Sequence, residues 1–141
     1  MNSRARDPAW AGALAPSIDE FTALAEDSLR RLPEPFRGLS KDVRMVVADF
    51  ADEALLDEMG IEDPFELTGV YQGVDLRRRS VLDPQPETAM VTLFRRPILD
   101  EWIERGDVAL GDLVEHVLVH EIGHHFGLSD DDIHAAEDDA G

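Results

Sequence analysis

One stretch near the C-terminal end constrains the fold more than any other, because residues 120–130 read HEIGHHFGLSD. On an α-helix, side chains four residues apart lie on one face, one turn apart. His120 and His124 can therefore direct two imidazole nitrogens at a single zinc ion. Glu121 lies about 100° around the helix from His120, where it could act as general base on a metal-activated water molecule. We expect the rest of the chain to hold this helix and give access to it.

The residues after the second histidine contain a candidate third ligand. Gly127 predicts a sharp reversal after the helix, because glycine readily adopts a left-handed backbone conformation. Asp130 could then direct its carboxylate back at the two histidines, leaving the fourth zinc position open, as in catalytic sites. Asp130, Asp131 and Asp132 are consecutive, however, and all three would also be favoured at the N-terminus of a helix. Asp131 or His134 could therefore take the place of Asp130.

Further residues are candidates for contacts with a metal ligand or the substrate: His116, His125, His134 and Tyr71. His116 lies one turn before His120 on the same helix face and could be an extra ligand. Tyr71 is the only tyrosine and could stabilise a developing oxyanion, although packing is its simpler role. The motif histidines could also be core residues neutralised by carboxylates, but burying both without a metal is costly.

Composition bounds the size of the protein and its partners. A chain of 141 residues fits one domain, and its net charge of -18 repels nucleic acids and anionic membranes. Cysteine is absent, which excludes disulfides, thiolate zinc sites and a cysteine nucleophile. No apolar run approaches the roughly 18–20 residues of a membrane helix. We therefore expect a cytoplasmic protein without nucleic-acid or membrane partners; the choice between monomer and homodimer stays open.

The order of segments predicts a mixed helix and strand domain. We expect a disordered leader over residues 1–16, the domain over residues 17–136 and an acidic tail over residues 137–141. Ser17 and Glu20 form a capping-box pattern at the start of the first helix. The helix over residues 110–126 is apolar nearly all round, with Phe126 on its apolar side, so it should be buried with its histidine face lining a cavity. The other expected elements are strands at 43–50, 67–76 and 89–94, and helices at 51–59, 98–104 and from 129 onward.

With these elements in place, the sequence resembles the minimal zincin-like metallopeptidase family of bacteria. The likeness rests on the H-E-x-x-H-x-x-G-x-x-D motif, on TLFRRPIL at residues 92–99 and on GVYQGV at residues 69–74. It implies an α+β, zincin-like fold with a small mixed sheet packed on the N-terminal helix and the C-terminal active-site helix. It also implies zinc ligands at His120, His124 and Asp130, with Glu121 as the general base.

The resemblance also implies an edge strand that binds an extended peptide by strand addition. We expect this strand at residues 89–94. The last methionine is Met90, so no methionine turn follows the motif.

The expected function is hydrolysis of peptide bonds in a peptide or protein by a zinc-dependent metallopeptidase. The alternative is a zincin-fold metal-binding protein with little or no proteolytic activity, serving as a peptide-binding or regulatory module. A single-metal RNA nuclease would share similar histidine spacing, but the acidic charge and Glu121 argue against it. A purely structural zinc site is disfavoured by the open fourth position.

Overall fold

The computed structural model describes residues 8–73 and 89–140, with side chains up to Glu137 in the last helix. Helices and a small number of strands form an α+β arrangement, as the sequence predicts. In chain order the elements are α1 (Ile18–Arg30), α2 (Phe36–Leu39), β1 (Arg44–Ala48), α3 (Glu53–Met59), the 3-10 helix η2 (Pro64–Glu66), β2 (Gly69–Gln72), β3 (Met90–Phe94), α4 (Arg95–Arg105), α5 (Leu110–His125) and α6 (Asp130–Ala140). The last part of the strand expected at 67–76, residues 74–76, lies outside the described residues.

The three described strands form one mixed sheet in the order β1-β3-β2. β1 pairs with β3 in parallel, with Val46 opposite Thr92, and β2 pairs with β3 antiparallel, with Val70 opposite Thr92. The expectation that residues 89–94 form the edge strand is therefore wrong. β3 is hydrogen-bonded on both sides, and within the described residues the edges are β1 and β2.

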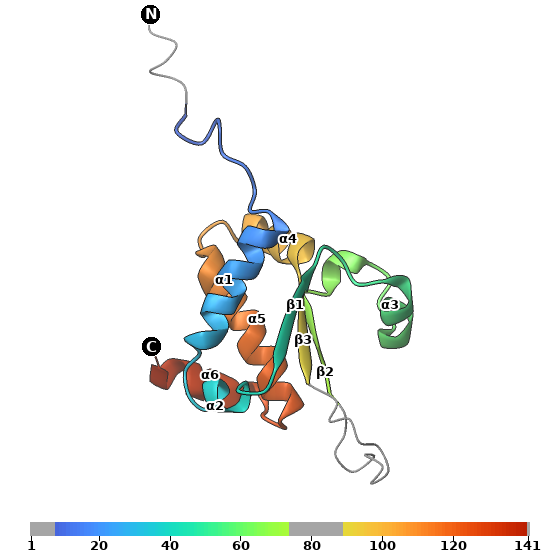
Figure 1. The fold of residues 1–141 in the computed structure, drawn as a ribbon, viewed down its shortest axis with the longest axis vertical. Coiled ribbons are helices and arrows are strands. Elements are labelled where there is room, and N and C mark those ends of the chain that lie inside the picture. Colours follow the sequence, from blue (N-terminus) through green and yellow to red (C-terminus); the bar gives the residue numbers. More distant parts are fainter. Residues whose placement is uncertain (1–7, 74–88, 141) are drawn as a thin grey trace, which may run out of the picture.

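Most helices cover one face of this sheet. α1 and α5 lie on one side of the strands and α3 on the other (Figure 1). Val91 and Leu93 of β3 are fully buried in the core that α1 and α5 share with the sheet, whereas Phe94 packs in a smaller cluster with Leu56 of α3. Val91 and Leu93 thus face one side of the sheet and Phe94 the other, because successive side chains of a strand point to opposite faces.

α5 is the most deeply buried helix. Its buried positions are Leu113, Val114, Val117, Leu118, Val119, Ile122 and Gly123. Each large aliphatic side chain among them contributes about 1.5–3 kcal/mol when fully buried. The buried side of α5 ends before Phe126, which we expected to be part of it. Phe126 lies just after the last helical residue and is 45% exposed. Because the buried residues of α5 pack into the core, the opposite side of the helix, which carries the histidines, faces away from it.

Capping interactions set the helix boundaries as the sequence indicates. The Glu20 N–H donates to Ser17 Oγ at 3.1 Å, and the Ser17 N–H donates to Glu20 Oε1 at 3.0 Å. Gly127 has a φ of 85°, so α5 ends in the predicted left-handed turn. Ser129 then caps α6, which continues to Ala140 and so includes residues 137–140, where we expected an acidic tail.

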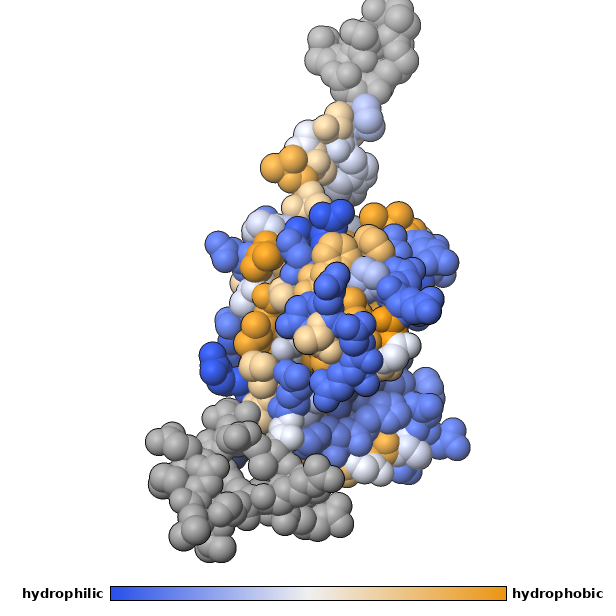
Figure 2. Space-filling view, turned by 90° about the vertical axis from the view of Figure 1, so that its right-hand side faces the viewer, coloured by the Kyte–Doolittle hydropathy of each residue, from blue (hydrophilic) through white to orange (hydrophobic). Residues whose placement is uncertain are grey.

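The surface is largely hydrophilic on the face that Figure 2 draws. Hydrophilic side chains cover much of the folded part on the face drawn in Figure 2, with apolar ones interspersed among them. Residues 8–16 contain turns but neither helix nor strand, and residues 1–7 of the expected leader lie outside the described residues. Across residues 8–73 and 89–140, every helix is too short or too polar to span a lipid bilayer.

Candidate metal centre

Three histidines follow one another on the exposed side of α5. His116, His120 and His124 are spaced four residues apart, so their rings stack up one helix face. The ring centroids are 4.2 Å apart between His116 and His120, and 5.7 Å apart between His120 and His124. This face is where the helix turns away from the core, so the imidazoles are available to groups from neighbouring elements.

α6 supplies a carboxylate to the two motif histidines. Asp130 Oδ1 lies 2.9 Å from His124 Nε2 and 3.8 Å from His120 Nδ1. One ligand atom from each of these three residues lies within 4.8 Å of the other two. Two imidazole nitrogens and one carboxylate oxygen are the donors that catalytic zinc sites use. The donor set and its spacing therefore fit a zinc ion.

A glycine inside the motif allows α6 to come this close. A Cβ atom added at Gly123 would lie 2.8 Å from two side-chain carbons of Ile133, which is fully buried between the helices. Gly127 supplies the reversal and Gly123 the close approach. Together they bring Asp130, at the start of α6, back to the two motif histidines of α5.

Glu121 lies in the same pocket as the histidines. This pocket of about 300 Å³ is lined by Thr68, Glu101, His116, Val117, His120, Glu121 and His124. Burial raises the pKa of Glu121 to about 7, and His124 opposes part of this shift. A carboxyl group with such a pKa can take up and release a proton near neutral pH.

The partly buried position of His120 also affects its protonation. Burial, and secondly the neighbouring His116, lower the pKa of His120. The imidazole is therefore neutral near pH 7, and only the neutral form binds a metal ion. His124 is more open to solvent, with a side chain that is 48% exposed.

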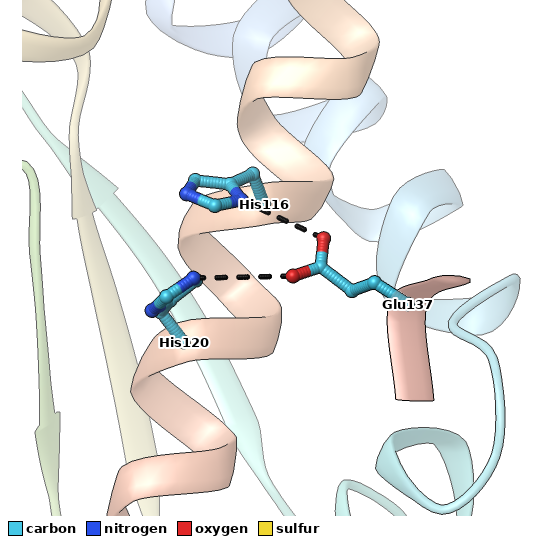
Figure 3. A group of neighbouring side chains, drawn as sticks. All are labelled: His116, His120 and Glu137. Atoms are coloured by element: carbon cyan, nitrogen blue, oxygen red, sulfur yellow. Dashed lines mark ion pairs between the residues drawn. The ribbon is translucent and has the colours of Figure 1, made fainter. Parts of the chain in front are cut away.

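A second carboxylate faces the histidines from further along α6. Glu137 Oε2 lies 3.5 Å from His116 Nδ1, and Glu137 Oε1 lies 3.9 Å from His120 Nε2 (Figure 3). Sequence reasoning missed this residue because it placed Glu137 in an acidic tail. The available signal was its spacing of seven residues from Asp130, which puts both carboxylates on one face if α6 continues as a helix.

The remaining candidates lie at different distances from this pocket. The ring of His134 lies edge-on to His120, with centroids 5.8 Å apart. His125 stacks instead on Tyr71 of β2, with centroids 3.8 Å apart and planes 22° apart, and neither residue lines the pocket. Burial raises the pKa of Tyr71, whose hydroxyl has no hydrogen-bond partner among the described residues. Asp131 belongs to neither group of ligand atoms found in the described chain.

An edge strand runs beside the pocket. β2 packs closely on α5, since a Cβ atom added at Gly69 would lie 3.0 Å from Val117 Cγ1. Thr68, immediately before β2, lines the pocket with the histidines. The strand next to the candidate site is thus β2 rather than β3.

Comparison with known proteins adds a family assignment. The profile of a family described as zincin-like metallopeptidase matches residues 40–140, which include every element from β1 to α6. A search of curated proteins finds no match. The matched region contains the whole pocket and both carboxylates that face the histidines.

Proposed function

Because the chain belongs to the zincin-like metallopeptidase family, we propose that it hydrolyses peptide bonds with zinc held by His120, His124 and Asp130. In this proposal Glu121 is the general base. The observation that carries it is the meeting of the three donor side chains, two of which line one pocket with Glu121, a carboxyl group whose pKa is raised to about 7.

The bound zinc would act as a Lewis acid on the scissile carbonyl and lower the pKa of the attacking water. Glu121 accepts a proton from that water on a carboxylate oxygen and then gives it to the nitrogen of the leaving amine. The partial burial that raises its pKa helps the second step, because a more basic carboxylate retains the proton until the amine needs it. His120 stays neutral at the same pH, so its ring nitrogen remains available as a ligand.

We propose that the substrate binds along β2. An extended peptide can add to an exposed sheet edge through main-chain hydrogen bonds. β2 is an edge strand of the described sheet, and Thr68 at its start lines the pocket that contains Glu121. A peptide on this edge would therefore bring one of its carbonyl groups toward the histidines.

Turnover of a peptide library tests the proposal. The tag-free protein is loaded with one equivalent of zinc, and cleavage products are identified by mass spectrometry. We expect cleavage by the loaded protein, its loss on chelation and its return when zinc is added back. Uncleaved peptides in the presence of a protein that holds one zinc ion would favour the alternative, a zincin-fold binding module without proteolysis. Cleavage that persists after complete chelation would contradict the metal-dependent chemistry.

A further inference from the structure

A second group of metal-ligating side chains lies one helical turn along α5 from the proposed zinc site. His116, His120 and Glu137 each offer a ligand atom within 4.8 Å of the other two. Figure 3 shows Glu137 reaching from α6 toward the two histidines of α5. All three residues are partly buried, unlike Asp130, whose side chain is 69% exposed.

The pairing of α5 with α6 creates this second group. Asp130 lies beside His124, and Glu137 lies beside His116, so the two helices run in opposite directions. Each carboxylate thus faces a pair of histidines four residues apart, and His120 belongs to both pairs. Its Nδ1 atom lies 3.8 Å from Asp130 Oδ1, whereas its Nε2 atom lies 3.9 Å from Glu137 Oε1.

The distances in the second group suit an ion better than hydrogen bonds. The two nitrogen–oxygen separations, 3.5 Å and 3.9 Å, exceed the roughly 2.7–3.2 Å of an N–H···O hydrogen bond. Ligand atoms bound tetrahedrally at zinc bond lengths lie about 3.3 Å apart. A small contraction of the group around an ion would therefore satisfy all three ligands.

Two atoms of the group are buried without a partner. Among the described residues, His120 Nε2 and Glu137 Oε1 are inaccessible to solvent and make no hydrogen bond. A buried polar atom left unpaired destabilises the fold, because it has lost its hydrogen bonds to water. A cation between the two atoms would remove this cost for both.

We propose that His116, His120 and Glu137 form a second binding position for a divalent transition-metal ion, about 6 Å along the helix axis from the first. Two imidazoles and a carboxylate select zinc, cobalt or nickel over calcium and magnesium, which prefer oxygen ligands. A neutral imidazole has one free lone pair, so His120 serves one position at a time. When the first ion holds His120, the second ion is held by His116 and Glu137 alone and therefore binds more weakly than the first.

Metal titration of the tag-free, metal-free chain tests this proposal without any substrate. Cobalt binding is followed by visible absorption and zinc binding by calorimetry. For the wild type we expect two steps, the second at least tenfold weaker than the first. His116→Asn and Glu137→Gln should each abolish the second step and change the affinity of the first by less than tenfold. His125→Asn is the matched control, because it removes a histidine of the same helix that stacks on Tyr71, outside both groups.

A single binding step in the wild type would overturn the proposal, and so would a second step that survives in both variants. If the wild type shows a single step and Glu137→Gln weakens that step tenfold or more, then Glu137 only orients His120 and binds no second ion. Circular dichroism verifies that each variant is folded. The readout is metal stoichiometry, so a chain that cleaves no peptide can still show the second step, and an active peptidase can lack it.

Discussion

Replacing Glu121 by glutamine is expected to stabilise the metal-free protein at pH 8. Burial raises the pKa of Glu121 to about 7 from an ordinary value of 4.5. At a pH between these two pKa values, Glu121 is protonated in the folded state but has lost its proton in the unfolded state. Stability therefore falls as pH rises through this window, and the full loss is present above about pH 7. Glutamine has similar size and no charge, so it avoids the loss.

The pKa shift sets the size of the effect. A difference of this magnitude between the folded and unfolded states corresponds to up to about 3 kcal/mol. For a chain of 141 residues, this raises the midpoint of thermal unfolding by about 10 °C. Below pH 4.5 the carboxyl group is protonated in both states, so the variant and the wild type should have nearly equal stability.

Urea unfolding at several pH values between 4.5 and 8.5, with a chelator present, measures this difference. Glu104→Gln is the matched control, because Glu104 is exposed on α4 and its replacement should change stability by less than about 0.5 kcal/mol. A Glu121→Gln effect that is constant across the pH range would refute the reasoning. So would a variant that is less stable than the wild type at pH 8.

Three further predictions concern the helices and the metal. Gly123→Ala should destabilise the fold by about 1–3 kcal/mol and weaken zinc binding, because the new methyl group pushes Ile133 and α6 away. Gly111→Ala is the control on the same helix: its new methyl group would lie 3.8 Å from Leu24 Cδ1, an ordinary contact, so it should be neutral or stabilising in the same urea assay. Asp130→Asn should weaken zinc binding at least about tenfold by calorimetry, whereas equal effects of Asp130→Asn and Asp131→Asn would remove the special role of Asp130. Zinc affinity should fall steadily from pH 7.5 to pH 5, because protonated imidazole cannot bind metal; a pH-independent affinity would contradict ligation by histidine.

Local signals in the sequence predicted the parts of the fold that depend on neighbouring residues. The capping pattern of Ser17 and Glu20 located the start of α1, and Gly127 located the turn after α5. Four-residue spacing predicted that His120 and His124 share a helix face, and the structure brings Asp130 to them. Their roles as zinc ligands stay predictions until metal binding is measured.

Features that depend on contacts between distant segments were not predictable in the same way. The position of β3 in the centre of the sheet follows from its pairing with β1 and β2, and a strand's own sequence carries little information about which strands flank it. Glu137 was missed because the acidic composition after residue 136 suggested a tail. Packing of Ile133 against Gly123 holds α6 on α5 instead, and the helix carries Glu137 to the histidines.

The most direct test of the proposed chemistry compares peptide cleavage by the wild type and by Glu121→Gln when both hold one equivalent of zinc. Glu121 is not among the proposed zinc ligands, so the variant should bind zinc like the wild type. Without a carboxylate to accept the proton, it should cleave at least about a hundredfold more slowly. Equal cleavage rates at equal zinc content would contradict the assignment of Glu121 as the general base.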